Sequence, residues 1–304
     1  MNHDINNKIE LKEAITWLIA FFDKFDFPLT SFEVWRYLSV KCDYLDVLII
    51  LDNACAAKLQ RSGGFYFLRG RESIVATRMR RYNYANRKFK KALFFTRIFR
   101  FIPWVKMVAV GNIIGSSNMK NSGDIDFFIV SEKKRIWMTR AFCVLVAKIL
   151  RARPGYNKTK DTICLSFYVT ENNLDLQKLT YGKEDKYFLF WLACLSPIYD
   201  TGGYYEKLID ENMWLLNQLP NWKKAVISER RTVKSRKSVF YHDIIDMFIG
   251  GLEPWAKKKQ LKIMPESLAR AINHPSKAVV INDDVLKLHV NDRRGEYNAS
   301  QIYN

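Results

Sequence analysis

Residues that bind zinc or form disulfide bonds are scarce in this sequence. It holds five cysteines, scattered along the chain with no Cys-x-x-Cys pair, and four histidines. A zinc finger needs several such ligands at short, regular spacings, so the sequence argues against one. Each cysteine is interpreted as a small buried hydrophobic residue of a protein in a reducing compartment.

Long apolar runs are also missing. Residues 137–150 are interrupted by Arg140 and Lys148, and residues 187–199 are too short, since a helix needs about 20 apolar residues to cross a bilayer. The first residues are polar and charged, so no secretory signal peptide is predicted. We therefore expect a soluble, cytoplasmic protein.

Acidic residues are few relative to basic ones, 31 against 49, and the formal charge is +18. This surplus favours a polyanionic partner, either nucleic acid or an acidic membrane surface. An organism with a lysine-rich proteome would produce the same balance, so charge alone leaves both explanations open. With 304 residues, 48% of them hydrophobic, the chain can form two or three domains with their own cores.

The most informative stretch is residues 105–130. An apolar strand is followed by a loop of Gly, Ser and Asn, and a second strand opens with Asp124-Ile125-Asp126. Because strand side chains alternate, Asp124 and Asp126 point the same way while Ile125 points into the core. Two such carboxylates suit a divalent cation, since Mg²⁺ prefers oxygen ligands and usually shares them with phosphates. Asp-x-Asp is also common in solvated turns.

In its order of strand, Gly/Ser loop, Asp-x-Asp and apolar strand, the chain resembles the core motif of the nucleotidyltransferase superfamily, which includes DNA polymerase β and the CCA-adding enzymes. The resemblance covers residues 105–175. It implies a mixed sheet with flanking helices, and transfer of a nucleoside monophosphate from an NTP to an acceptor hydroxyl. It also implies Mg²⁺ or Mn²⁺ at Asp124 and Asp126. The positions that match the phosphate-binding loop are Gly111, Asn112, Ser116 and Ser117.

The sequence departs from the family pattern at two points. Gly111-Asn112 stands where the family has Gly-Ser. The predicted strand at residues 163–169, where the family carries a third acid, has Ser166 near its middle. The nearby acids are Asp161, Glu171 and Asp175. These departures support a second hypothesis, in which a catalytically degenerate nucleotidyltransferase fold serves as a nucleic-acid-binding regulator or adaptor.

Residues 1–71 are predicted to form a winged helix-turn-helix domain, because three helices precede a hairpin. Thr30 and Glu33 fit a capping box at the start of the second helix. The third helix carries mainly acids and few basic residues, which argues against phosphate contacts in a DNA groove. A protein-docking role is equally open. The predicted elements are helices at residues 11–25, 32–38 and 44–58, and a hairpin at residues 59–68.

Residues 72–103 are predicted to form a basic connecting helix that Pro103 ends. Aromatic residues are interleaved with the basic ones, as in proteins that stack bases and contact phosphates. The alternative is a helix with a solvated charged face whose aromatics pack on the next domain, and we favour this packing for the aromatics. The arginines still indicate a polyanion. The residues expected to contact RNA or DNA are Arg78, Arg80, Arg81, Arg87, Lys88, Lys90 and Lys91.

The remainder divides into a nucleotidyltransferase-like domain, residues 104–182, and a mainly helical C-terminal region, residues 183–304. Ser131 is expected to cap a helix that follows the Asp-x-Asp strand. The basic residues 222–238 are interpreted as a solvated linker or a second nucleic-acid contact, and the last dozen residues as a mobile tail. Helices are predicted at residues 132–150, 187–195, 204–219 and 239–262, and a small hairpin at residues 278–289.

Overall fold

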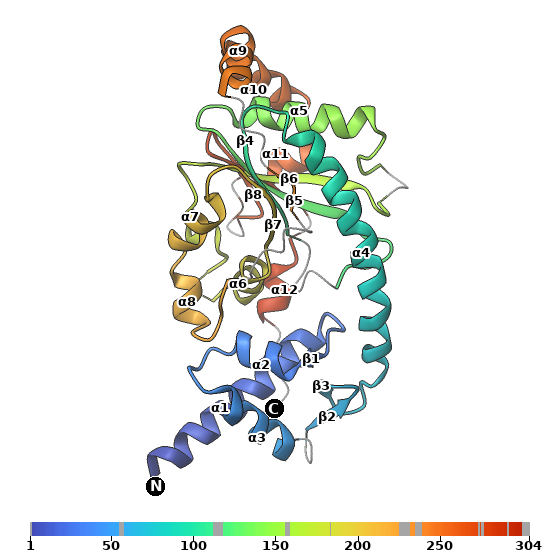
Figure 1. Cartoon of the computed structure of the whole chain (residues 1–304), viewed down its shortest axis with the longest axis vertical. Coiled ribbons are helices and arrows are strands. Elements are labelled where there is room, and N and C mark those ends of the chain that lie inside the picture. Colours follow the sequence, from blue (N-terminus) through green and yellow to red (C-terminus); the bar gives the residue numbers. More distant parts are fainter. Residues whose placement is uncertain are drawn as a thin grey trace.

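The computed structural model describes residues 2–54, 58–111, 118–155, 159–182, 184–224, 232–234, 239–272, 274, 277–290 and 292–299. The protein has a mixed α/β fold, as the sequence predicts. A six-stranded mixed sheet with helices against it forms the larger part, and one long helix links it to an N-terminal unit with a three-stranded sheet (Figure 1). No helix among the described ranges is both long and apolar enough to cross a membrane.

The N-terminal unit contains the three predicted helices and the predicted hairpin. Its elements are α1 (Asn2–Asp23), β1 (Leu29–Thr30), α2 (Ser31–Tyr37), α3 (Tyr44–Ala54), β2 (Leu59–Ser62) and β3 (Phe65–Leu68). The capping box is confirmed, because the backbone N–H of Glu33 donates to Thr30 Oγ1 at 3.2 Å and that of Thr30 donates to Glu33 Oε2 at 2.9 Å. The short strand β1, which pairs with β3, was not predicted.

The connecting helix α4 (Ser73–Phe99) runs along one side of the molecule from the hairpin to the main sheet (Figure 1). It matches the predicted basic helix, although it ends four residues earlier than expected. Its Phe95 and Phe99 are buried against the main sheet, and Phe99 packs edge-on against Phe127 with ring centroids 5.8 Å apart. These two aromatics therefore pack on the next part of the chain, as the sequence favoured.

The main sheet has the strand order β7-β4-β5-β6-β9-β8. Strands β5 and β6 are parallel and are joined through α5 (Ile136–Ile149), while the other neighbours are antiparallel. Side chains on β5 alternate between two cores: Phe128 packs toward the N-terminal unit and α6, and Ile129 toward α4 and α5. The strands are β4 (Val105–Val110), β5 (Ile125–Ser131), β6 (Ile163–Thr170), β7 (Ser196–Asp200), β8 (Val279–Ile281) and β9 (Val285–Leu288).

The C-terminal region corrects the prediction of a mainly helical part, because it supplies three strands of the main sheet. Pro197 suggested a break between helices, yet it lies in β7. An edge strand tolerates proline, since its N–H on the outer side has no partner to lose. The predicted hairpin is confirmed as β8 and β9, and β9 extends the sheet by pairing with β6.

The helices of this region are shorter than predicted. The predicted helix at residues 204–219 is two helices, and the one at residues 239–262 is interrupted by a turn over Gly250–Leu252. Glycine costs helix stability, which explains a break at Gly250-Gly251. The observed helices are α6 (Lys186–Ala193), α7 (Tyr204–Asp210), α8 (Trp214–Gln218), α9 (Val239–Ile249), α10 (Glu253–Lys262), α11 (Glu266–Ala271) and α12 (Arg294–Ala299).

Two further predictions were wrong. Ser131 does not cap α5: it is the last residue of β5, and the N-cap is Arg135, which makes no side-chain capping bond. The predicted mobile tail includes α12, whose Arg294 is only 4% exposed. Its polar composition suggested mobility, but buried ion pairs fix it in place. The basic segment at residues 222–238 falls mostly outside the described residues.

Candidate functional site

Asp124 and Asp126 converge at the start of β5, as the alternation of strand side chains predicts. Asp124 precedes the strand, Asp126 is its second residue, and Ile125 between them is fully buried. The neighbouring parallel strand β6 places Cys164 directly opposite Asp126. One ligand atom from each of Asp124, Asp126 and Cys164 lies within 4.8 Å of the others.

The cluster concentrates negative charge in partly dehydrated surroundings. Burial raises the pKa of the Asp124 carboxyl, even though hydrogen bonds and the charge of Lys88 oppose this. Burial also raises the pKa of the Cys164 thiol well above its usual value, and the charges of Asp126 and Asp124 add to that effect. A cation bound between the two carboxylates would remove this unfavourable arrangement.

The donor set fits a hard divalent cation in part. Mg²⁺ is commonly held by one or two carboxylates, with substrate phosphates and waters completing its shell, and Asp124 and Asp126 supply that number. Cys164 is a poor ligand for Mg²⁺, because thiolates prefer softer metals and its raised pKa keeps the thiol protonated. The residues present therefore suit one Mg²⁺ or Mn²⁺ ion better than a pair bridged by a third acid.

None of the three acids near β6 joins the cluster within the described part of the chain. Asp161 forms ion pairs with Lys88 at 2.8 Å and Arg87 at 3.1 Å. Glu171 follows the far end of β6, about 26 Å from the start of the strand at the usual rise of about 3.3 Å per residue, and it accepts a hydrogen bond from Tyr204. Asp175 lies beyond Glu171 and pairs with Lys178.

Two basic side chains of α4 anchor the backbone around the acid pair. Lys88 is fully buried, and its Nζ donates to the carbonyl of Gly123, the residue before Asp124. Arg81 donates to Asn118 Oδ1 at 2.6 Å, just after the predicted phosphate loop. This positioning role was missed at the sequence level, because both residues looked like solvent-exposed charges.

Only one residue of the predicted phosphate loop is described. Gly111 follows β4, and its N–H donates to the carbonyl of Asp126 at 3.0 Å. A Cβ at Gly111 would lie 2.8 Å from Trp191 Nε1, so the indole ring requires glycine there. Asn112, Ser116 and Ser117 lie outside the described residues, and their phosphate contacts stay a prediction.

A cavity of about 210 Å³ adjoins Asp126. Its aromatic wall comes from β6, α6 and α12, and its polar wall from β9 and the start of α12. Trp191 stacks on Phe188 and Phe167, with ring centroids 5.3 Å apart in each case. Flat aromatic rings beside a carboxylate and cations make a site suited to a planar, anionic ligand.

Comparison with known proteins identifies no relative of this chain. No family model matches the sequence, and no curated protein or solved structure is significantly similar to it. The resemblance to nucleotidyltransferases therefore stays a prediction.

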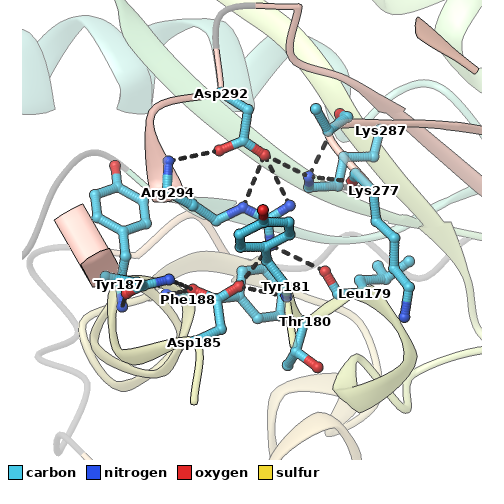
Figure 2. Close-up of polar contacts among 12 residues, drawn as sticks. Leu179, Thr180, Tyr181, Asp185, Tyr187, Phe188, Lys277, Lys287, Asp292 and Arg294 are labelled. Atoms are coloured by element: carbon cyan, nitrogen blue, oxygen red, sulfur yellow. Dashed lines mark hydrogen bonds and ion pairs between the residues drawn. The ribbon is translucent and has the colours of Figure 1, made fainter. Parts of the chain in front are cut away.

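An ion-pair network forms part of the polar wall of the cavity. Figure 2 shows Arg294 between two carboxylates, with Nη1 2.7 Å from Asp185 and Nη2 2.7 Å from Asp292. Lys287 from β9 lies 3.7 Å from Asp292. Its burial, together with the charge of Arg294, lowers the pKa of Lys287 to about 7.

A polar chain runs from the cavity to the acid pair. His289 Nε2 lies 3.0 Å from Ser166 Oγ, which in turn lies 3.1 Å from Cys164 Sγ. Burial lowers the pKa of His289 to about 4, so the ring is neutral at pH 7. Its Nδ1 has no hydrogen-bond partner among the described residues. His289 could not be recognised from the sequence, because its neighbours along the chain form an ordinary small hairpin.

The predicted nucleic-acid contacts divide into two groups. Arg78, Arg81 and Lys88 are buried and engaged within the chain: Arg78 pairs with Glu33 at 2.8 Å and lies over the ring of Phe27. Their side chains are therefore not available at the surface. Of the others, Arg80, Arg87 and Lys90 are exposed to solvent, and Lys91 is half-buried.

Proposed function

We propose that the chain binds a nucleoside triphosphate through a divalent cation at Asp124 and Asp126, and transfers the nucleoside monophosphate to an acceptor hydroxyl. The observation that carries the proposal is the convergence of these two carboxylates beside a cavity with aromatic and cationic walls. In such a reaction the acceptor oxygen forms a bond to the α-phosphorus and pyrophosphate leaves.

Each part of the site has a role in this proposal. The carboxylates of Asp124 and Asp126 hold Mg²⁺ or Mn²⁺, which supplies charge neutralisation for the phosphates. Gly111, which follows β4, approaches the triphosphate. The aromatic wall around Trp191 contacts the base, since rings of this kind accept any base by stacking.

The acceptor in this proposal is nucleic acid, RNA or DNA. The surplus of basic residues supports it, as do the exposed side chains of Arg80, Arg87 and Lys90 along α4. The winged-helix prediction for the N-terminal unit rests on its element order, three helices followed by a hairpin. Its α3 carries acids rather than arginines, so we assign this unit to docking a partner protein rather than to reading a DNA groove.

A second function has an observation in its favour. Cys164 faces Asp126 from the neighbouring strand, the position from which a third carboxylate could share a metal. With a protonated thiol there, the two carboxylates of Asp124 and Asp126 can still bind one cation. The site then has no third carboxylate to help activate the acceptor hydroxyl. The alternative is a catalytically degenerate nucleotidyltransferase fold that binds nucleotide and nucleic acid as a regulator or adaptor.

One experiment tests the proposal. The protein is incubated with each labelled NTP, with Mg²⁺ or Mn²⁺ and with a pool of cellular RNA, beside the double variant Asp124→Ala/Asp126→Ala. We expect label transfer that falls to background in the double variant. Transfer that survives in the variant would show that the acid pair is not the catalytic site.

The matched control is Asp43→Ala/Asp46→Ala, which removes two exposed acids near the start of α3 and should leave transfer unchanged. Mn²⁺-dependent nucleotide binding, measured by calorimetry, separates the two functions. Binding that needs Asp124 and Asp126, without transfer to any acceptor, supports the degenerate form. Absence of both binding and transfer would contradict both functions.

A further inference from the structure

A second cavity, of about 500 Å³, lies between α5, α10 and α11. These helices gather at the end of the molecule opposite the N-terminal helices (Figure 1). The wall is mainly aromatic and aliphatic, with contributions from Trp137, Phe142, Leu145, Trp255, Ile263 and Leu268. Its volume falls in the range of pockets that hold small organic ligands, roughly 300 to 1,000 Å³.

The charges of this cavity all have one sign. Arg140, Lys148, Arg153 and Lys259 contribute to its wall, and no described residue that lines it is acidic. Cations in an apolar wall without acids favour an anionic ligand, because the low local dielectric strengthens their attraction for it. The combination of an apolar wall and one-sided charge selects a ligand that is itself apolar at one end and anionic at the other.

Arg140 on α5 is the cation placed to bind such an anion. Its Nη1 donates to Gln260 Oε1, and Gln260 is held by the carbonyl of Trp137 at 2.8 Å. Arg140 Nε has no hydrogen-bond partner among the described residues, and none of their carboxylates forms an ion pair with this side chain. Burial lowers the pKa of Arg140, and the charge of Arg153 adds to the effect.

Arg140 is half-buried, and a guanidinium whose Nε is buried without a partner among the described residues is a costly arrangement in a folded chain. A carboxylate from a ligand would relieve it, since a guanidinium binds the two oxygens of a carboxylate through parallel N–H groups. The size of the cavity favours a free monomer over a membrane surface, because about 500 Å³ between the helices can hold a single small molecule.

We propose that this cavity binds a small-molecule carboxylate with an apolar body, of the class of single-chain fatty acids, with its carboxylate on Arg140. The apolar chain lies along the wall formed by α5, α10 and α11. This site is separate from the Asp124 and Asp126 site, and it stands whether or not nucleotidyl transfer occurs.

Calorimetric titration of the full chain with dodecanoate, below the concentration at which it forms micelles, tests the proposal. We expect saturable binding of one molecule per chain, with a change in tryptophan fluorescence because Trp137 and Trp255 line the cavity. Dodecanol, which has the same chain and no charge, should bind at least about tenfold more weakly, as the loss of a charge-assisted hydrogen bond implies. Equal binding of dodecanol would overturn the proposal.

Two variants locate the site. Arg140→Gln removes the charge, and Leu145→Asp adds an acid at a lining position that is 51% exposed, where the substitution should not prevent folding. Both should weaken dodecanoate binding about tenfold or more, while Arg97→Gln, at an exposed arginine of α4, should not. Unchanged affinity in both variants would overturn the proposal. So would adsorption to phosphatidylglycerol vesicles without binding of monomeric dodecanoate.

Discussion

Cys164 faces Asp126 across the parallel pair of β5 and β6, so a thiol occupies the position from which a third carboxylate could complete the metal site. We predict that Cys164→Asp creates a stronger cation site. Without metal, the added charge should destabilise the fold, by about 1–3 kcal/mol, through repulsion and burial. With millimolar Mn²⁺, its melting temperature should rise more than that of the unmodified chain, because an ion bound only to the folded state stabilises it.

Cys164→Asn is the matched control for this prediction, since it has a similar size and no charge. Its melting temperature should respond to Mn²⁺ no more than that of the unmodified chain. If the Asn and Asp variants respond equally, the three side chains do not share a metal, and the candidate site loses its geometric basis.

Lys88 should stabilise the fold by holding the backbone at the start of β5 in place. Replacing it by methionine leaves Asp161 without its closest cation and the carbonyl of Gly123 without this donor. We expect a loss of about 2–4 kcal/mol in the free energy of unfolding, as for other broken buried ion pairs. The measurement is equilibrium unfolding in urea, with Lys90→Met on the same helix as a control.

Lys90 is exposed, so its replacement should change stability by no more than about 0.5 kcal/mol. Lys88 also lowers the pKa of Asp124, against the raising effect of burial. Equal stability of the two variants would show that the buried pair with Asp161 does not hold the strand.

The sequence predicts those features that depend on short-range patterns. The alternation of strand side chains brings Asp124 and Asp126 together, and the capping box of Thr30 and Glu33 depends on residues three apart. Both follow from local backbone geometry, which one segment determines by itself. The prediction of a mixed α/β fold likewise depends on elements whose periodicity is visible in single segments.

Features that depend on distant partners could not be predicted. Cys164 joins the acids only because β6 pairs with β5 in one register, and a shift of one residue would point it to the other face. Arg294 is buried because Asp185, 109 residues earlier, accepts its hydrogen bond. Lys88 is buried because of Asp161 in the same way. Charged residues are normally exposed. The burial of Arg294 or Lys88 can therefore be predicted only when the carboxylate that pairs with it is known.

Lys287 should make the stability of the fold depend on pH. Its pKa is lowered from 10.5 to about 7 by burial, and by the charge of Arg294. Below about pH 7 the amine is protonated in both the folded and unfolded states. Between about pH 7 and its usual pKa, only the unfolded state keeps the proton, so this residue makes stability rise with pH, by up to about 1.4 kcal/mol per unit.

Comparison with Lys287→Met isolates this contribution. The free energy of unfolding of the unmodified chain, relative to the variant, should be higher at about pH 9 than at about pH 6. Urea unfolding at the two pH values measures the difference, and Lys258→Met, at an exposed lysine of α10, serves as the control. A difference that is constant with pH, or that falls as pH rises, would contradict the lowered pKa.

Gly111 should tolerate no side chain while Trp191 keeps its position. In Gly111→Ala the new Cβ would lie 2.8 Å from the indole Nε1, so the ring or the end of β4 must move. We expect a loss of about 1–3 kcal/mol, the usual cost of an overpacked core. Gly123→Ala is the control, because its Cβ would meet the nearest atom at an ordinary 3.5 Å.

A double-mutant cycle with Trp191→Phe identifies the cause. The smaller ring should make room for the methyl group, so Gly111→Ala should cost at least about 1 kcal/mol less in that background. Urea unfolding of the four chains gives the coupling energy. If the two changes are additive, the glycine is not required by Trp191, and nothing then links the end of β4 to the aromatic wall of the cavity beside Asp126.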